Sequence, residues 1–588
     1  MNHKTLLRFS LMTMLLLMAH SLQAVTTIQV GASQTNTTIS ASITAAGDIT
    51  GSGGLILELQ SDYAPVDEII STVTGASATD PVTIRPAAAL SLSSVAWTIS
   101  GSYITIDGRV GSTGSTKALT LSNTSTTGVT LTISGNNNAV KYCTLQGMNT
   151  SATAGVVVFG ASTGNVVDYC DIRDVPATGT PVNGIYSASA STNTVSNSNI
   201  YNYYHATVGP KGICLDANTT GWTISGNSFY DTSNTERSFT ASPADVTAIY
   251  INNASGNGFT VTGNYIGGQS ASCGGSAQKL GVSAGTTTSG VRFRGIYLKV
   301  GATSATSVQN NTIKNLIIST GYANVTNSNA TAFIFLDAGA INCGNETGNI
   351  IGSTTANSSI VFNTNQTSNV VTPMYGIYAG NDATGNVIIS NNKIGGITVG
   401  GNINNGSLTF NGILVNGAKS SYTLTVSGNT IGGSVSNSIQ NMVTSRSRNT
   451  FGIKVNLTSG TATINNNTIA NLYGANITSN ACAGIHLAAG NINVYNNIIH
   501  DIKGGAVNTA QYLDGGIVTE GSTGTVNIYG NEIYNISNTN AAASRVSGIN
   551  MNNGAAAAIK IYNNKIYNII PGSVAGQATA GIYISAAN

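Results

Sequence analysis

From about residue 180 onward the chain repeats one two-part unit, and a repeat of this kind leaves few architectures open. Each unit begins with Gly-Ile, continues through a run rich in β-branched residues, and ends with Asn-Asn or Gly-Asn, any residue, and Ile. Near the end of the chain the opening glycine recurs every 32 or 33 residues, at Gly452, Gly484, Gly516, Gly548 and Gly581. Earlier intervals include 28, 36 and 40 residues, which indicates loop insertions between constant anchors, as in a solenoid.

Apolar residues alternate within each unit, as Ile453 does with Val455 and Val526 with Ile528. A period of two is typical of a strand with one buried face, and no helical spacing accompanies it. A propeller blade needs about 40 to 50 residues and four strands, whereas the tightest units here leave room for about three short strands. The sequence therefore predicts an all-β chain that forms a three-sided parallel β-helix.

The asparagine that closes each unit provides an independent test of this register. Coiling places equivalent residues of neighbouring coils about 4.8 Å apart, so these side chains form one column. Asparagine adopts turn conformations readily, and stacked amides hydrogen-bond to one another, which favours a structural ladder over ligand binding. The predicted ladder consists of Asn227, Asn264, Asn311, Asn349, Asn392, Asn429, Asn467, Asn497, Asn531 and Asn564.

Toward the N-terminus the same column continues through Ser198, Cys170 and Cys143. Stacked Cα atoms at about 4.8 Å are within reach of a disulfide, so a Cys143–Cys170 bridge and a pair of inward thiols are both compatible with the register. The remaining cysteines show no zinc-binding spacing, and we expect no metal cofactor from them.

Charge and the N-terminus bear on location and partners. Lys and Arg number 23 and Asp and Glu 21, and only 7% of residues are charged, which argues against nucleic acid as a partner. Residues 1–24 have the basic, apolar and small-residue regions of a signal peptide, so we expect a secreted protein or one on the outer surface of a bacterium. No later apolar run is long enough for a transmembrane segment.

Two segments carry a family resemblance. Residues 81–86 (Pro-Val-Thr-Ile-Arg-Pro) and 103–108 (Tyr-Ile-Thr-Ile-Asp-Gly), followed by the Asn-x-Ile units, resemble the entry into a right-handed parallel β-helix of the pectin-lyase-like superfamily. Large exported bacterial surface proteins have similar repeats. The resemblance implies an N-terminal cap with the first coils over residues 25–100 and β-helix repeats over 101–588. The last repeat stops mid-coil, so end-to-end self-association is one expectation.

Proteins of this superfamily include lyases, glycoside hydrolases and adhesins, so the fold alone does not select a function. The polygalacturonase signatures are absent from the sequence. The strongest catalytic candidates are Asp174 and Asp231, which lie two coils apart in a turn column and are expected about 9.6 Å from each other, near the upper limit for an inverting glycosidase. An ordinary turn is the alternative for both. Asp168, Asp171 and Asp174 share one coil and could bind calcium, although Arg173 lies among them.

Aromatic residues recur in the strand that follows the opening glycine. Simple alternation places them on the outer surface, where their rings could bind the faces of sugars without using charge. Packing against one another or beneath loops is the alternative. The predicted ligand-binding column consists of Tyr186, Tyr250, Tyr297, Phe335 and Tyr378.

These features favour an exported, noncatalytic, adhesin-like surface or matrix protein that binds neutral polysaccharide. The alternative is a polysaccharide lyase or glycoside hydrolase whose catalytic residues are placed by column and not by a local motif.

Overall fold

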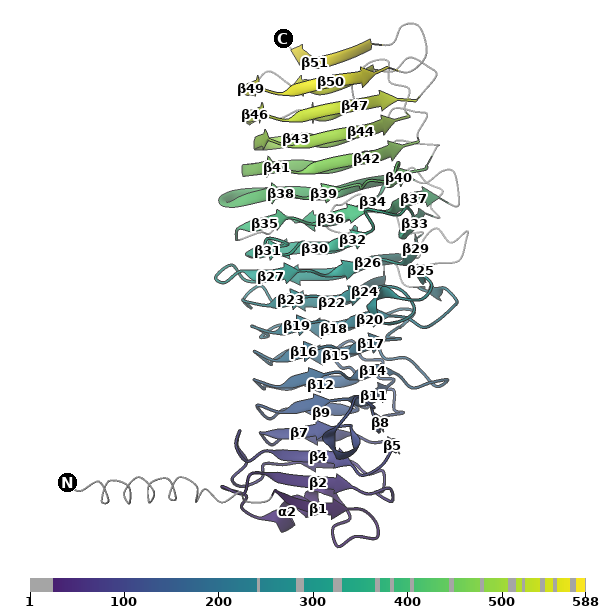
Figure 1. Ribbon diagram of the computed structural model, residues 1–588, viewed down its shortest axis with the longest axis vertical. Helices are drawn as coiled ribbons and strands as arrows, with labels where there is room; N and C mark the ends of the chain where they lie inside the picture. The colour runs from purple at the N-terminus through teal and green to yellow at the C-terminus, as the bar shows by residue number, and fades with distance from the viewer. Residues whose placement is uncertain are drawn as a thin grey trace, which may run out of the picture.

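The computed structural model describes residues 25–240, 244–281, 290–320, 330–364, 371–380, 385–401, 407–443, 449–475, 481–505, 514–520, 524–539, 545–553, 558–571 and 578–586. The described chain winds into a long column of stacked coils (Figure 1). Every pairing recorded between its named strands is parallel, from β1 with β2 to β48 with β51. The predicted signal peptide lies outside the described residues.

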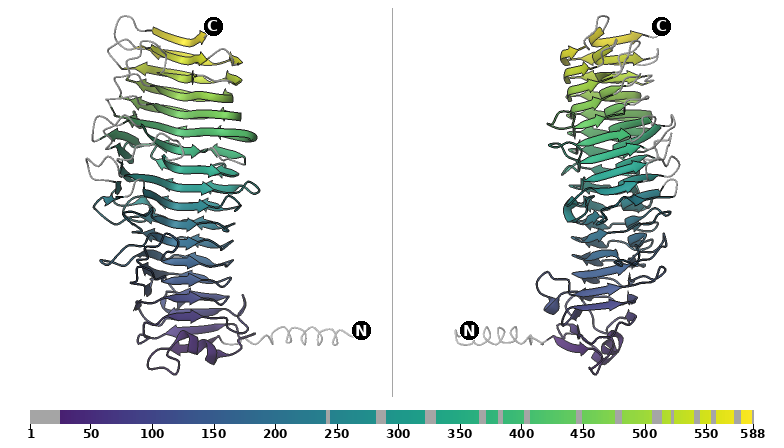
Figure 2. Two further views of the ribbon diagram at one scale, coloured as in Figure 1. Left: turned by 180° about the vertical axis from the view of Figure 1, so that it is seen from behind. Right: turned by 90° about the vertical axis from the view of Figure 1, so that its right-hand side faces the viewer.

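Successive coils place their strands in three long stacks that run along the column (Figure 2). The first stack contains the strands that carry the opening glycines and their counterparts in the other coils: β3 (Glu68–Ile70), β6 (Trp97–Ile99), β9 (Leu131–Ile133), β12 (Val157–Phe159), β15 (Asn183–Ser187), β18 (Lys211–Leu215), β22 (Ala244–Asn252), β26 (Val291–Lys299), β30 (Thr331–Ala338), β34 (Val371–Ala379), β38 (Ser407–Ser427), β41 (Thr450–Asn465), β43 (Cys482–Tyr495), β45 (Asp514–Glu520), β48 (Arg545–Asn553) and β51 (Ala578–Ala586). Three of these strands, β38, β41 and β43, continue without a break into the second stack.

The second stack leads to the asparagine corner. It contains β1 (Thr26–Val30), β2 (Leu55–Leu59), β4 (Val82–Pro86), β7 (Ile104–Asp107), β10 (Ala139–Lys141), β13 (Val166–Asp168), β16 (Thr194–Ser196), β19 (Thr223–Ser225), β23 (Thr260–Thr262), β27 (Thr306–Gln309), β31 (Ile341–Cys343), β35 (Val387–Ser390), β46 (Val526–Tyr529) and β49 (Ile559–Tyr562).

The third stack follows that corner, and a short fourth stack accompanies it in the middle coils. The third contains β5 (Leu90–Ser93), β8 (Leu119–Ser122), β11 (Cys143–Gly147), β14 (Asp171–Asp174), β17 (Asn199–Tyr201), β20 (Ser228–Tyr230), β24 (Tyr265–Ile266), β28 (Thr312–Ile313), β32 (Ile350–Gly352), β36 (Lys393–Gly395), β39 (Thr430–Ile431), β42 (Thr468–Gly474), β44 (Ile498–Gly504), β47 (Glu532–Asn538) and β50 (Lys565–Ile570). The fourth contains β21 (Arg237–Ser238), β25 (Gln278–Gly281), β29 (Leu316–Thr320), β33 (Ile360–Thr364), β37 (Ile397–Gly401) and β40 (Ile439–Asn441). The predicted all-β parallel β-helix is thus confirmed.

A short helix, α2 (Ile39–Ala46), lies at the N-terminal end of the column beside β1 (Figure 1). The side chain of Thr38 caps it by accepting a hydrogen bond from the backbone N–H of Ala41. The buried carboxylate of Glu68 accepts further hydrogen bonds from the backbone N–H groups of Ile39 and Ser40. Two 3-10 turns, η1 (Val110–Ser112) and η2 (Ala271–Cys273), interrupt later loops.

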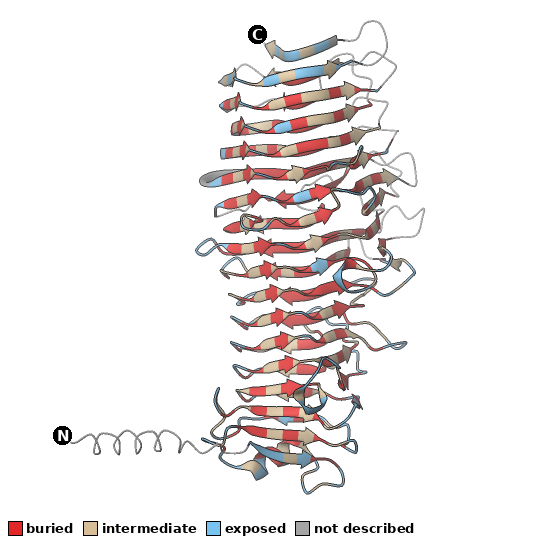
Figure 3. Cartoon of the chain, viewed as in Figure 1, coloured by how far each residue is buried: buried red, intermediate tan, exposed pale blue. Residues whose placement is uncertain are grey.

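One hydrophobic core runs through the column from Val30 to Met551. It consists of the inward residues of all three long stacks, and their alternation with outward residues is visible as buried and less buried bands along each strand (Figure 3). Within β43, for example, Ile485 and Leu487 are fully buried. The interior is therefore filled with side chains, and any functional surface lies on the outside of the coils.

The asparagine column forms a continuous hydrogen-bonded ladder along the corner between the second and third stacks. Asn392 donates from both its backbone N–H and its Nδ2 to Oδ1 of Asn429, each at 3.0 Å. Asn429 repeats both bonds to Asn467, and its Nδ2 also donates to the carbonyl of Ile389 at 2.9 Å. The corner thereby satisfies buried polar groups that would otherwise lose their hydrogen bonds to water.

A second, shorter ladder occupies the corner that precedes the second stack, and the sequence analysis did not detect it. The backbone N–H of Asn138 donates to Oδ1 of Asn165, and that of Asn165 donates to Oδ1 of Asn193. These residues stand before Val140, Val167 and Val195 as Asn-x-Val. The inward valine replaces the isoleucine of the main motif, so these residues lie outside the Asn-x-Ile pattern.

The opening glycine is required by close packing. A Cβ atom on Gly484 would lie 2.4 Å from Cγ2 of Ile499 and 2.8 Å from the carbonyl oxygen of Gly516 in the next coil. The Gly-Ile repeat therefore marks the point where the first stack passes over the isoleucines of the third stack.

Candidate functional site

The aromatic column predicted to bind ligand exists, but it is buried. Strand pairing places Tyr250, Tyr297, Phe335 and Tyr378 on successive coils, with Tyr186 two coils earlier, as the register predicts. Phe335 is only 1% exposed and Tyr378 is 0% exposed, while Tyr186 and Tyr297 are also buried and Tyr250 is partly buried. The prediction that this column is an open sugar-binding strip is therefore wrong for the described coils.

The reason is a contact across the opening glycine: the residue before the glycine and the residue two positions after it pack against each other. The rings of Tyr375 and Tyr378 stack at 5.5 Å in this way, and the guanidinium group of Arg294 lies 5.0 Å from the ring of Tyr297. The rings form a second hydrophobic cluster outside the main core, together with Ala332.

Cys143 and Cys170 form no disulfide, and both are free and fully buried thiols. Their Sγ atoms lie 3.4 Å from the carbonyl oxygens of Lys141 and Asp168, respectively, and that of Cys170 lies 3.5 Å from the carbonyl of Val140. The two side chains thus take the places of the asparagines in the corner column and bond to the backbone. Of the two arrangements compatible with the register, the pair of inward thiols is the one observed.

The two candidate catalytic carboxylates are each held by an arginine. Asp174 accepts a hydrogen bond from Arg173 at 3.1 Å and another from Nδ2 of Asn202 at 3.0 Å. Asp231 is bound by Arg237 through two hydrogen bonds, at 2.7 and 3.0 Å. Asn202 stands between their coils and has a positive φ of 58°, which is typical of a turn position.

The other two acidic residues proposed for a calcium site, Asp168 and Asp171, are each hydrogen-bonded to different side chains. Asp168 accepts hydrogen bonds from Ser196 and Asn197, whereas Asp171 accepts them from Lys117 and Asn199. Across the described residues, no three His, Cys, Asp or Glu side chains converge in an arrangement that could hold a metal ion.

Exposed aromatic residues instead gather on both sides of the asparagine corner in the coils nearest the C-terminal end. On the second stack the rings of Tyr495, Tyr529 and Tyr562 stack at 4.9 Å with interplanar angles of 8° and 3°. On the third stack the rings of His500, Tyr534 and Tyr567 stack at 4.8 and 4.9 Å with angles of 3° and 7°. We call these six residues the double aromatic ladder.

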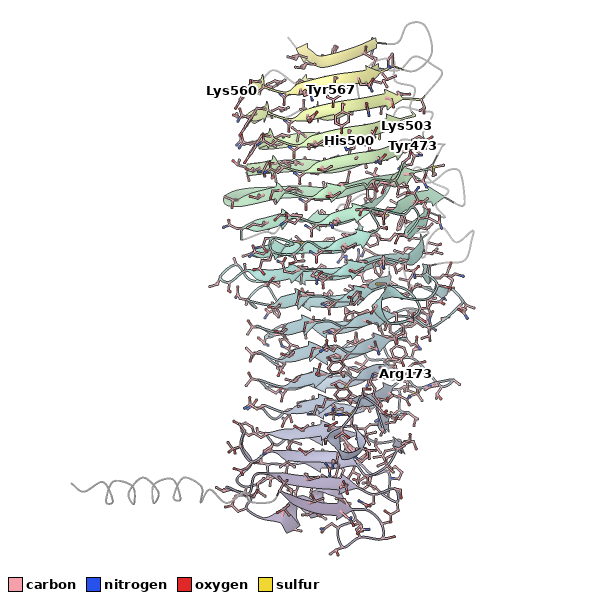
Figure 4. The ribbon with its side chains drawn as sticks, viewed as in Figure 1. Arg173, Tyr473, His500, Lys503, Lys560 and Tyr567 are labelled. Carbon is pink, nitrogen blue, oxygen red and sulfur yellow. The ribbon has the colours of Figure 1, made fainter. Side chains whose placement is uncertain are left out.

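The double aromatic ladder is accessible and rigid. Tyr562 is 47% and Tyr567 41% exposed, and the other four members are partly exposed. Figure 4 labels His500 and Tyr567 on these coils, with Tyr473 and Lys503 close by on the same side of the column. Because each ring is fixed to a strand and to its neighbour in the stack, little conformational entropy is lost when a ligand binds.

Polar groups border the ladder on the third stack. Glu532 accepts hydrogen bonds from Nζ of Lys565 at 2.7 Å and from the hydroxyl group of Tyr567 at 3.0 Å. The hydrogen bond from Lys565 lowers the pKa of Glu532, so this carboxylate stays ionised at neutral pH. His500 is hydrogen-bonded through Nδ1 to Asp501 at 2.6 Å. The ladder therefore combines apolar ring surface with hydrogen-bonding groups and nearly balanced charge.

The sequence carries a signal for this site that the predicted ligand-binding column did not include. The three coils share the pattern Tyr, Asn or Gly, Asn, any residue, Ile, and His or Tyr, which starts at Tyr495, Tyr529 and Tyr562. The asparagine and isoleucine of this pattern define the repeat, and the same register places the aromatic residues beside them in columns.

Asp514, at the start of β45, is a buried carboxyl group whose ionisation is predicted to affect stability. It accepts hydrogen bonds from the backbone N–H of Cys482 at 2.9 Å and from Nδ2 of Asn538 at 2.5 Å. Burial raises the pKa of Asp514 to about 7, whereas the pKa of an aspartate in an unfolded chain is about 3.9. Between these values the folded chain holds a proton that the unfolded chain has lost, so stability falls as pH rises through this range.

We therefore expect the free energy of unfolding to decrease between about pH 5 and about pH 8 by on the order of a few kcal/mol. The midpoint of urea unfolding should decrease accordingly. Asp514→Asn removes the ionisation and is expected to flatten this dependence. Urea titrations of both chains at the two pH values provide the measurement, and equal pH dependence in the two chains would refute the prediction.

Comparisons with known proteins identify no family for this chain. No protein-family model matches the chain, and no curated protein matches it. One solved structure, that of the PL6-family alginate lyase AlyGC, is similar over 96% of this chain and 99% of its own, with 10% sequence identity and a TM-score of 0.27. No helix within the described residues has the length and apolar character needed to cross a membrane. At this TM-score the similarity carries no weight, so it is the parallel strand pairing and the corner ladder that identify the protein as a parallel β-helix.

Proposed function

We propose that this protein is an exported, noncatalytic surface or matrix protein of a bacterium that binds a neutral polysaccharide along the double aromatic ladder. The observation that carries the proposal is the stacking of exposed aromatic rings on three consecutive coils, on both sides of one corner. Contiguous exposed apolar patches on a protein surface often mark sites of contact with a ligand or partner.

The repeat of the ladder suits a polymer. Its rings recur at 4.8 to 4.9 Å along the column, and an extended polysaccharide also presents ring faces and hydroxyl groups at regular intervals. Because the rings stack face to face, they offer ring edges and hydroxyl groups along the column, which matches the mixed apolar and polar character of a sugar. With 7% charged residues, the chain offers little general attraction to a charged polymer.

The surroundings of the catalytic candidates support the noncatalytic part of the proposal. A general acid or base must be free to exchange its proton with a substrate. Asp174 and Asp231 are each engaged by an arginine and by a second hydrogen-bond donor. We accordingly assign them to the turns of their coils and not to a reaction.

The test is affinity electrophoresis of residues 25–588 in gels containing soluble neutral polysaccharides such as β-glucan, xylan and galactomannan. We expect at least one polymer to retard the wild-type chain. The double substitution Tyr529→Ala with Tyr534→Ala is expected to weaken that binding by roughly tenfold or more, because it removes one ring from each side of the ladder. Reducing-end and unsaturated-product assays on the bound polymer are expected to show no turnover.

The matched control is Tyr265→Ala, which removes an exposed tyrosine of the third stack outside the ladder. This variant should bind like the wild type. Equal losses in the control and the ladder variant, or retardation by none of the polymers, would contradict the assignment of the ladder. Turnover of a bound polymer would instead support the enzyme alternative and direct attention to Asp174 and Asp231.

A further inference from the structure

Two tyrosines at the asparagine corner adopt a backbone conformation that bulky residues rarely adopt. Tyr142 and Tyr169 have φ values of 53° and 52° and occupy the position just before the inward corner residue. In the other coils where this position has a positive φ, it is always asparagine or glycine: Asn197, Gly226, Gly263, Asn310, Asn391, Gly428, Asn466, Asn496, Gly530 and Asn563. A tyrosine is strained in this region, and such strain is retained where it has a use.

The two strained rings form a stack that is anchored at one end. The rings of Tyr142 and Tyr169 lie 4.9 Å apart with an interplanar angle of 5°. Arg109 belongs to the coil before that of Tyr142, and its guanidinium group lies 4.2 Å from the Tyr142 ring. Arg109 is itself fixed by two hydrogen bonds to the buried carboxylate of Asp107, at 2.8 and 2.7 Å, and by a third to the carbonyl of Gly114. The stack therefore has a rigid base.

The opposite end of the stack is open. Tyr169 is 43% exposed, and within the described part of the chain Tyr142 is the single ring or cation that contacts it. The next coil places Asn197, a shorter residue, at the corner position above it. One ring at the end of the stack is thus held in a fixed orientation with accessible apolar surface.

Hydrogen-bonding groups flank this ring on both sides. Asp168 precedes it on the second stack, and its recorded hydrogen bonds from Ser196 and Asn197 both go to Oδ1. Asp171 follows it on the third stack, and its recorded bonds from Lys117 and Asn199 also both go to Oδ1. Among the described residues, the two Oδ2 atoms accept no hydrogen bond and are available to hydroxyl groups of a ligand.

We propose that Tyr169, with Asp168 and Asp171 beside it, is a binding site for a single neutral pyranose that stacks on the tyrosine ring and donates hydroxyl hydrogen bonds to the two carboxylates. Sugar hydroxyl groups donate well to ionised carboxylates, and the flat apolar side of a pyranose packs on an aromatic ring. The site is independent of the proposed function, because the double aromatic ladder lies on other coils.

The substitution Tyr169→Asn distinguishes a binding role of the tyrosine from a stabilising role of the stack, because the two roles predict opposite changes in melting temperature. Tyr169→Asn places at this position the residue that other coils use there, and so relieves the backbone strain while it removes the ring. If the tyrosine is retained for binding, the variant loses ligand and keeps or gains thermal stability. If the stack is retained for stability, the variant melts at a lower temperature.

The experiment is saturation-transfer NMR on residues 25–588 with the methyl glycosides of glucose, galactose, mannose and xylose. We expect at least one glycoside to bind the wild type and its signal to fall by roughly tenfold or more in Tyr169→Asn, with an unchanged or higher melting temperature. Tyr169→Phe keeps the ring and is expected to keep most of the binding, and Tyr265→Asn is the control at another exposed tyrosine.

The ladder variant Tyr529→Ala with Tyr534→Ala is measured in the same series, so that the two sites are distinguished. Loss of the signal in Tyr169→Asn with retention in the ladder variant supports the proposal. Absence of binding by all four glycosides, equal binding by Tyr169→Asn and the wild type, or a lower melting temperature of Tyr169→Asn would each overturn it.

Discussion

Asn429→Ala is expected to lower the free energy of unfolding by about 3–5 kcal/mol, because it interrupts the corner ladder in the middle of the column. The substitution removes the acceptor for the backbone N–H and Nδ2 of Asn392 and the donor to the carbonyl of Ile389. Oδ1 of Asn467 loses its bond from Nδ2 of Asn429 and keeps the one from the backbone N–H. All of these groups are buried, so water cannot replace the lost bonds without opening the corner. Each buried group left without a partner costs about 1–3 kcal/mol.

Urea unfolding followed by circular dichroism measures this effect. Asn357→Ala is the matched control, since Asn357 is exposed and makes one hydrogen bond, to the carbonyl of Ser436. It should change stability by less than about 0.5 kcal/mol. If the two variants unfolded at the same urea concentration, the ladder would contribute nothing beyond an ordinary surface turn.

Phe335→Ala is the second substitution with a large expected effect, about 3–5 kcal/mol, because it leaves a cavity in the buried aromatic cluster. The Phe335 ring packs between those of Tyr297 and Tyr378, at 5.4 and 4.5 Å, and the guanidinium group of Arg294 lies 4.2 Å from it. These partners are themselves attached to strands and cannot collapse fully into the space. Polysaccharide binding by the folded fraction of this variant is expected to equal that of the wild type.

Tyr567→Ala provides the contrast, because Tyr567 is 41% exposed at the end of the double aromatic ladder. We expect it to change the melting temperature little and to weaken polysaccharide binding. The reverse pattern, in which Phe335→Ala binds less and melts normally while Tyr567→Ala binds normally, would restore the first aromatic column as the binding surface.

The difference between these two columns shows where prediction from sequence failed. Both aromatic columns can be identified from the repeat register, and strand pairing places Tyr297 opposite Phe335 as that register requires. Alternation correctly excluded these rings from the main core, but it carries no information about which side chains pack against them on the outside. Tyr375 packs onto Tyr378 across the opening glycine, and this contact between residues outside the main core buries a position that alternation assigns to the surface.

The roles of the cysteines and acidic residues were left open for a similar reason. The register placed Cys143 and Cys170 on neighbouring coils, yet whether they bond to each other or to backbone carbonyls depends on side-chain direction. Asp174 and Asp231 were found by column, but the arginines that bind them come from positions one and six residues away whose side-chain orientations a sequence does not specify.

The sequence by itself determined that this protein is a parallel β-helix. A chain of short alternating strands, repeated with a fixed glycine and a fixed asparagine, can bury its apolar side chains only by coiling on itself. It also determined which asparagines share a column, because stacking at one spacing transfers the register from coil to coil. Only the tertiary structure decided which aromatic residues face solvent. Exposure depends on side-chain contacts across the opening glycine and between neighbouring coils, and the spacing of residues along one strand does not specify these contacts.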